Sequence, residues 1–245
     1  MGIRFNYEIE SYEELSEQAA QIVKAAIAEK PDLVLGLPTG STPEGMYKNL
    51  IEMNKSGEID FSKVRTFNLD EYYPIKRDNE QSYYKFMFDK LFNHVNINLE
   101  NINIPDGEAA DPDMECMKYE QKIGKAGGID LMILGIGANG HIGFNEPGES
   151  LVPLTHVAEL TEDTIKANAR FFNSAGEVPK TALTMGMGSI IARSKKILLL
   201  VSGESKAQVF RQFFNGGMIS TGNPATLLYL HGDVTVLSDI KSGGE

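Results

Sequence analysis

Cysteine and tryptophan are nearly absent from this chain of 245 residues, which has one cysteine, Cys116, and no tryptophan. A lone thiol cannot form an internal disulfide. No second thiol or suitably spaced histidine accompanies Cys116, so the sequence predicts no metal site there. We expect a passive, half-buried thiol in a protein of the reducing cytoplasm.

Long apolar runs and an excess of basic residues are also missing. No 18 consecutive apolar residues occur, so we expect no membrane span. The chain holds 23 Lys and Arg against 34 Asp and Glu, which gives a formal net charge of −11. This balance argues against nucleic acid as a partner, because phosphate backbones are held by clustered Lys and Arg. It leaves room for a small anionic ligand, which needs only a few local cations and backbone N–H groups.

The sequence does show a regular alternation of short apolar runs with amphipathic segments. The apolar runs predict buried strands at Asp32–Leu37, Val64–Leu69, Ile129–Gly137, Lys195–Gly203 and Asp233–Asp239. Helical spacing predicts helices at Ser11–Lys30, Pro43–Met53, Ser82–Phe92, Asp111–Lys125, Asp163–Asn168 and Ser205–Phe214. The alternation predicts an α/β fold with one doubly wound, mainly parallel sheet and helices on both faces, a Rossmann-like three-layer sandwich. Residues 1–245 are expected to form a single domain.

Ligands of such sheets bind at the carboxyl ends of the strands, and the first of these ends here is followed by PTGSTPEGMY. Gly40, Ser41 and Thr42 form a small-residue turn, and Thr42 before Pro43 is typical of an N-cap before a first-turn proline. The turn offers N–H groups and hydroxyls to an anion. It matches neither a P-loop nor a dinucleotide fingerprint, and a phosphate site and a plain turn explain it equally well.

Two acids, Asp70 and Glu71, follow the predicted strand Val64–Leu69. Adjacent acids after a strand are usually a solvated turn, but a desolvated carboxylate there can act as a general base. Because side chains alternate along an extended chain, we expect only one of the two to enter a pocket.

The segment GIGANGHIGFNEPG, residues 135–148, is rich in glycine and carries an amide, an imidazole and a carboxylate at Asn139, His141 and Glu146. The glycines allow a ligand to approach the backbone. His141 titrates near neutral pH and can exchange protons with a sugar oxygen, while Glu146 can fix its tautomer. No second histidine lies nearby, so no metal is predicted.

Two cations, Arg170 and Lys206, lie near predicted strand or helix ends. Each is by itself best explained as a surface cation, although Lys206 is placed to reach a bound phosphate. The segment RFFNSAGEVPK, which begins at Arg170, is a candidate lid.

Six segments in this order resemble the glucosamine-6-phosphate deaminase (isomerase) family: GLPTGSTP, FNLDEYY, GIGANGHIGFNEPG, NARFF, PKTALTMGMGSI and SGESKA. The resemblance runs from about Leu33 to Asp239. It implies conversion of glucosamine 6-phosphate and water to fructose 6-phosphate and ammonia, without a cofactor. It assigns enolisation to Asp70, ring opening to His141 with Asn139 and Glu146, and substrate binding to Gly40, Ser41, Thr42, Arg170 and Lys206. Many relatives have Asp where this chain has Asn139. Because an amide carries no charge, the negative charge near His141 then falls on Glu146.

Two rival functions remain. A 6-phosphogluconolactonase shares the Gly-Ser-Thr-Pro turn and a Gly-His segment, but has a basic residue where this chain has Tyr72. A sugar-phosphate sensor is the non-enzymatic alternative, and the joint presence of Asp70, His141 and Glu146 argues against it. The partner is expected to be a sugar phosphate. The sequence does not decide between a monomer and a homo-oligomer, and we do not expect an allosteric hexamer, because the chain ends soon after the last predicted strand.

Overall fold

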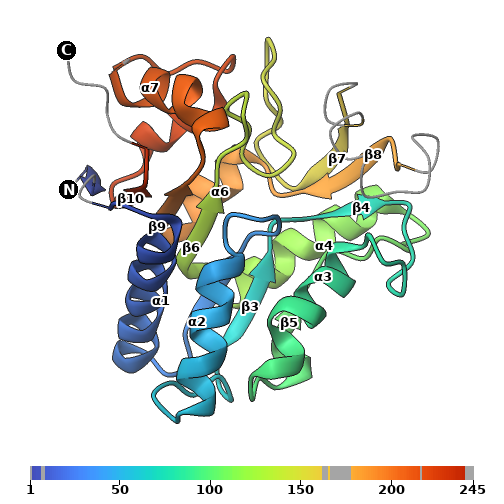
Figure 1. Cartoon of the computed structure of the whole chain (residues 1–245). Coiled ribbons are helices and arrows are strands. Elements are labelled where there is room, and N and C mark those ends of the chain that lie inside the picture. The colour runs from blue at the N-terminus through green and yellow to red at the C-terminus, as the bar shows by residue number, and fades with distance from the viewer. Residues whose placement is uncertain (1, 7–8, 162–164, 166–177, 216, 241–245) are drawn as a thin grey trace.

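Seven parallel strands, in the order β1-β10-β9-β6-β2-β3-β5, form the central sheet of this computed structural model (Figure 1). The structure describes residues 2–6, 9–161, 165, 178–215 and 217–240. The strands span Ile3–Asn6 (β1), Val34–Leu37 (β2), Arg65–Asn68 (β3), Ile102–Asn103 (β5), Ile129–Gly135 (β6), Ser194–Val201 (β9) and Val234–Ser238 (β10). All four residues of β2 are buried, as expected for a strand covered on both faces.

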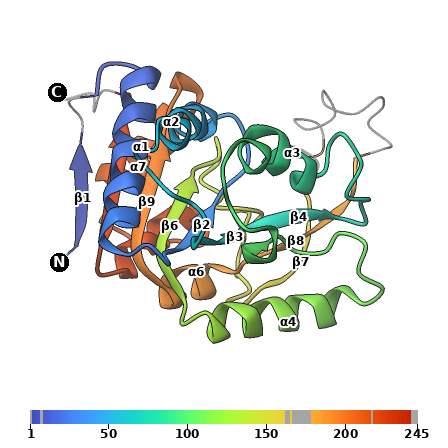
Figure 2. The same cartoon turned by 90° about the horizontal axis from the view of Figure 1, so that it is seen from below.

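Helices cover both faces of this sheet, as Figure 2 shows. They span Tyr12–Glu29 (α1), Glu44–Lys55 (α2), Tyr83–Lys90 (α3), Pro112–Lys125 (α4), Met187–Arg193 (α6) and Ala207–Asn215 (α7). Two apolar cores lie on the two faces of the sheet, because side chains alternate between these faces along β6. Leu131 and Ile133 pack with α1 and α2, whereas Met132 and Leu134 pack with α4, α6 and α7. The predicted three-layer α/β sandwich is therefore confirmed.

A second sheet of three antiparallel strands, in the order β4-β8-β7, was not predicted from the sequence. Its strands span Asp70–Tyr73 (β4), Thr181–Thr184 (β8) and His156–Glu159 (β7). Because only Leu69 separates β3 from β4, the chain passes from the central sheet directly into the small one. A separate apolar cluster that includes Tyr72, Phe144 and Ala182 fills this region.

The predicted strands and helices agree with the structure to within a few residues, with three exceptions. Six elements were not predicted: β1, β4, β5, β7, β8 and α6. The predicted helix Asp163–Asn168 lies almost wholly outside the described residues. Thr42 was wrongly predicted to cap α2: the N-cap position is Pro43, which makes no side-chain capping bond, and the Thr42 hydroxyl instead accepts a hydrogen bond from Lys206.

The switch point of the sheet lies between β2 and β6. From β2 the chain continues to β3 and β5 on one side, and from β6 it continues to β9 and β10 on the other. The connections that follow β2 and β6 therefore part at this point, which is where open α/β sheets form a ligand crevice. No helix among the described residues is long and apolar enough to cross a membrane.

Candidate active site

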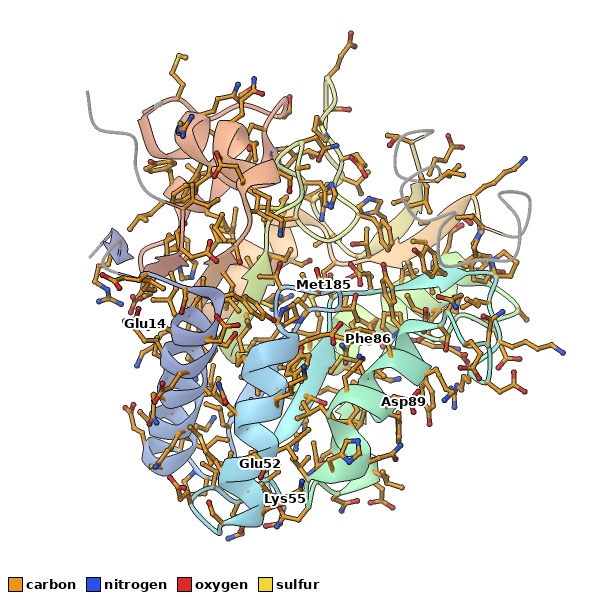
Figure 3. The ribbon with its side chains drawn as sticks, viewed as in Figure 1. Glu14, Glu52, Lys55, Phe86, Asp89 and Met185 are labelled. Carbon is orange, nitrogen blue, oxygen red and sulfur yellow. The ribbon has the colours of Figure 1, made fainter. Side chains whose placement is uncertain are left out.

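A cavity of about 450 Å³ lies at the switch point. Of the residues predicted for the site, it is lined by Gly40, Ser41, Thr42, Asp70, His141 and Lys206. Asn139 and Glu146 do not line the cavity; both lie next to Nδ1 of His141. Arg170 and the candidate lid up to residue 177 lie outside the described residues. The exposed ion pair Glu52–Lys55 lies at the C-terminal end of α2, away from the turn that precedes this helix (Figure 3).

One end of the cavity is built to receive an anion. The turn between β2 and α2 contains Gly40 in the left-handed region, with φ of +92°, a conformation that favours glycine. The backbone N–H groups of Gly40, Ser41 and Thr42 donate no hydrogen bond to any other residue that the structure describes. Free N–H groups beside a helix start attract negative charge, because they combine unused donors with the positive end of the helix dipole.

Lys206 adds a positive charge at the same end. It lies in a short 3-10 helix, Glu204–Lys206, just after β9, and its Nζ donates to Thr42 Oγ1 over 2.8 Å. Burial lowers the pKa of Lys206, and the nearby Asp239 carboxylate opposes that change. The sequence alone favoured a surface cation, whereas the structure makes Lys206 a partly buried lysine of the cavity wall.

Asp70 provides the cavity with a carboxylate that lacks its usual partners. Its side chain is 5% exposed, and no described residue donates a hydrogen bond to it. Burial raises the pKa of Asp70 to about 8, and the neighbouring Glu71 charge adds to the rise. A carboxylate with a pKa so close to neutral is suited to proton transfer.

Glu71 points away from the cavity, as the predicted alternation required. Its carboxylate accepts hydrogen bonds from the backbone N–H groups of Tyr72 (2.9 Å), Tyr83 (2.8 Å) and Tyr84 (2.8 Å). The last two belong to the first turn of α3, so Glu71 caps that helix and ties it to β4. Burial raises the pKa of Glu71 to about 7, although these hydrogen bonds oppose the rise.

Replacing Glu71 with alanine should therefore destabilise the fold. The change leaves three backbone N–H groups without their acceptor at a position that is 2% exposed. We expect a loss of about 3 kcal/mol in the free energy of unfolding, measured by urea denaturation at pH 7. Glu52→Ala, which alters an exposed ion pair on α2, is the control and should cost under about 1 kcal/mol. Equal effects of the two changes would contradict this role of Glu71.

His141 is oriented by a chain of two residues. Glu146 Oε2 accepts from Asn139 Nδ2 over 2.7 Å, which fixes the orientation of the Asn139 amide because a carboxylate can only accept. Asn139 Oδ1 lies 2.7 Å from His141 Nδ1 and also accepts from the His141 backbone N–H. An amide oxygen cannot donate, so Nδ1 carries the proton of the neutral ring. Nε2 is then the ring nitrogen free to exchange a proton with a ligand.

The glycines of this segment serve close packing as well as unusual backbone angles. A Cβ on Gly137 would lie 2.1 Å from His141 Cε1, so the imidazole can sit against the backbone only where no side chain is present. Gly137 also accepts from Gly140 N–H over 3.0 Å and donates to the His141 carbonyl over 2.9 Å. The turn thus holds the ring over Gly137.

Sequence reasoning missed an aromatic wall beside Asp70. Tyr72, Tyr83 and Phe144 all line the cavity, with ring centroids 4.8 to 6.0 Å apart. Phe86 of α3, labelled in Figure 3, lines the cavity as well. Period-two alternation in DEYY would have placed Tyr72 on the same face as Asp70, but the segment was read as a turn. These rings keep water from the carboxylate and so contribute to its burial.

No group of three or more metal-binding side chains occurs among the described residues. Beside Glu44 and Glu80, the cavity offers the buried carboxylate of Asp70, one imidazole, one ammonium and an anion-binding turn. This set is suited to binding an anionic molecule at one end and to moving protons at the other.

Comparisons with known proteins place this site in a family. A model described as glucosamine-6-phosphate isomerases/6-phosphogluconolactonase matches residues 8–236. The protein named glucosamine-6-phosphate deaminase from Thermoanaerobacter sp. (strain X514) is 61% identical over 229 residues, which are 94% of this chain and 90% of that protein. The protein of the same name from Clostridium beijerinckii is 55% identical over 231 residues, 94% of this chain and 95% of its own.

Solved structures agree with the sequence matches. A monomeric glucosamine-6-phosphate deaminase is 48% identical, with a TM-score of 0.91 and coverage of 97% of each chain. A 6-phosphogluconolactonase from Thermotoga maritima is 21% identical, with a TM-score of 0.73 over 97% of this chain and 98% of that one, which shows a shared fold. The chain therefore belongs to the glucosamine-6-phosphate isomerase/6-phosphogluconolactonase family.

Proposed function

We propose that this chain is a glucosamine-6-phosphate deaminase, a hydrolase that converts glucosamine 6-phosphate and water to fructose 6-phosphate and ammonia. Relatives that are 54 to 61% identical over nearly the whole chain carry that name. The observation that carries the proposal is the content of the cavity: an anion-binding turn, a buried carboxylate without a hydrogen-bond donor and an oriented histidine. Both sheets contribute to it, which supports a single domain over residues 1–245.

The phosphate group of the substrate binds at the turn. Its oxygens accept from the N–H groups of Gly40, Ser41 and Thr42, and Lys206 supplies the positive charge. We propose Arg170 as a further phosphate contact, on the family resemblance alone. With the phosphate fixed at one end, the sugar extends toward Asp70 and His141.

His141 opens the sugar ring. Its Nε2 takes the proton of the anomeric hydroxyl and returns one to the ring oxygen, so that the C1–O bond of the ring breaks and C1 becomes an aldehyde. Asn139 holds the proton on Nδ1 of His141 in place. Glu146 carries a negative charge, which stabilises the protonated imidazole of His141 through Asn139.

Asp70 then removes the proton from C2, which the new aldehyde has made acidic. The same proton is delivered to C1, and the enol-type intermediate becomes an imine at C2. Water adds to that carbon and ammonia leaves, which yields the ketose. The bond that is cleaved is a C–N bond and water is consumed, so the reaction is a hydrolysis.

The test is release of ammonia and fructose 6-phosphate when glucosamine 6-phosphate is added to the purified chain. We expect equal amounts of both products without added metal or cofactor. No ammonia, together with hydrolysis of 6-phosphogluconolactone, would reject the proposal in favour of the lactonase. Binding of the sugar phosphate without either reaction would favour a sensor.

Lys206→Met should weaken substrate binding while leaving turnover nearly unchanged. A hydrogen bond to a charged group contributes about 1.5–3 kcal/mol, so we expect KM to rise roughly 10- to 100-fold. Lys196→Met is the control, because Lys196 is an exposed lysine of β9 whose nearest acid, Glu29, is 3.8 Å away. Steady-state kinetics of both variants measure the effect. A fall in kcat at constant KM would remove Lys206 from the binding role.

The single thiol fits the expected cytoplasmic location, which we retain as a proposal. Cys116 is buried, and burial raises its pKa to about 11, so it remains a protonated and unreactive thiol.

A further inference from the structure

A carboxylate lies just behind the phosphate-binding end of the cavity, where negative charge would ordinarily oppose an anionic ligand. Asp239 follows β10, and its Oδ2 accepts from Ser202 Oγ over 2.5 Å. Its Oδ1 accepts from the Gly203 backbone N–H over 3.2 Å. Asp239 does not line the cavity itself. Its two hydrogen bonds fix the turn that follows β9.

That turn carries Lys206. Gly203 has a φ of +94°, and its carbonyl accepts from the Lys206 backbone N–H over 3.0 Å. From there the lysine side chain reaches Thr42 in the turn after β2. A continuous set of contacts thus runs from Asp239 through Gly203 and Lys206 to Thr42, and it joins the ends of β10, β9 and β2.

Among the acids near Lys206, Asp239 is the one whose charge favours the ammonium form of the lysine. Burial lowers the pKa of Lys206, and Asp239 is the charged group that raises it. Glu44, on α2, lines the same cavity but already pairs with Lys90 over 2.8 Å. Asp70 on β4, His141 after β6 and Glu80 before α3 line the cavity too, and Glu204 is exposed on the same short helix as the lysine.

We propose that Asp239 is the positioning residue of the phosphate site: it fixes the Ser202–Gly203 turn from which Lys206 reaches the ligand, and it balances the ammonium charge inside the fold. The inference rests on the proposed function, in which Lys206 binds the substrate phosphate. It assigns Asp239 no contact with the substrate.

Asp239→Asn tests the proposal because it removes the charge and keeps an oxygen for the Gly203 N–H. We expect KM for glucosamine 6-phosphate to rise about tenfold, with kcat within about twofold of wild type. The alkaline rise of KM should also begin at a lower pH in the variant, because Lys206 loses its proton sooner without the Asp239 charge. Asp233→Asn is the matched control: Asp233 lies just before the other end of β10 and pairs with Arg4.

An unchanged KM and an unchanged alkaline limb in Asp239→Asn would overturn the proposal, as would equal changes in the Asp233→Asn control. Should Asp239→Asn fail to fold, Ser202→Ala takes its place, because it removes the 2.5 Å hydrogen bond and leaves the charge. We expect about a threefold rise in KM from that change. A wild-type KM in Ser202→Ala would then reject the positioning role.

Calorimetric titration separates this inference from the proposed function. Fructose 6-phosphate and inorganic phosphate serve as probes, and both should bind Asp239→Asn about tenfold more weakly than wild type. If the wild-type chain releases no ammonia but shows this difference, the proposed reaction fails and the role of Asp239 stands. If ammonia is released and the two proteins bind both probes equally, the reaction stands and Asp239 has no such role.

Discussion

Asp70→Asn should lower kcat by about 10²–10⁴-fold while KM stays within a few-fold of wild type. A positioned base contributes a rate factor of this size, and an amide of the same shape cannot accept the C2 proton. Steady-state release of ammonia measures kcat and KM. The control is Asp106→Asn, because Asp106 is a half-buried acid near Glu71 that does not line the cavity. A rise in KM with an unchanged kcat would mean that Asp70 is not the base.

The same substitution should make the protein more stable at alkaline pH. In the unfolded chain an aspartate has a pKa of about 4, whereas burial raises the pKa of Asp70 to about 8 in the folded state. Between these values the folded state holds a proton that the unfolded state has lost. The contribution of Asp70 to stability is therefore full below about pH 4 and is lost as the pH rises to about 8. Melting temperatures of wild type and Asp70→Asn should diverge across this range in favour of the variant.

The pH dependence of catalysis follows from the same group. After correction for ionisation of the substrate, kcat/KM should rise with pH through about 8, because Asp70 of the substrate-free enzyme becomes a carboxylate in this range. At higher pH it should fall again, because burial lowers the pKa of Lys206 and the phosphate site loses its charge. A profile that is flat between pH 6 and 9 would contradict the assignment of Asp70.

His141→Gln should have the second largest effect, a fall of about 10²-fold in kcat/KM. Glutamine can still hydrogen-bond but cannot transfer the ring-opening proton. His156→Gln is the control, because His156 lies on β7 and its Nδ1 only contacts the Leu154 carbonyl. Loss of activity in both variants to the same degree would point to a general structural cause.

Isotope effects separate the two catalytic roles. With glucosamine 6-phosphate deuterated at C2, a primary isotope effect reports the step assigned to Asp70. When His141→Gln makes ring opening slow, this effect should shrink toward one, because the C–H bond is broken after the limiting step. An isotope effect that instead increases in His141→Gln would place His141 in the enolisation step.

Much of this site was predictable because each residue directly follows a strand with a clear apolar pattern. Asp70, His141 and Lys206 fall at the ends of β3, β6 and β9, and the sheet rule then brings them to one edge. Alternation also correctly separated Asp70 from Glu71. The glycines of residues 135–148 were expected to let a ligand approach the backbone, and in the structure the His141 ring also lies against Gly137.

What the sequence could not predict depends on partners that are distant in the chain. Lys206 is partly buried, and its hydrogen-bond acceptor Thr42 lies 164 positions away in the chain. The same contact engages the Thr42 hydroxyl that was expected to cap α2. The adjacent acids of β4 left a solvated turn and a desolvated base both open, and no strand was predicted there because acids are uncommon inside strands. These two acids are buried in different surroundings: Glu71 accepts from three backbone N–H groups, whereas Asp70 lines the same cavity as Tyr72, Tyr83 and Phe144. The strands β5, β7 and β8 are short, and their local pattern carries little signal.

The antiparallel pairing of β4 with β8 also determines when activity can appear during refolding. Asp70 pairs with Thr184, and the Thr181 hydroxyl bonds the Tyr73 carbonyl across a sequence separation of 108 residues. Contacts this distant form slowly, because the intervening loop must close before they form. Helical signal should thus recover early after dilution from denaturant, while ammonia release should recover only with the slowest phase. Asp70 lies on β4, whose pairing with β8 forms only when distant parts of the chain have folded. Turnover therefore serves as a reporter of full folding.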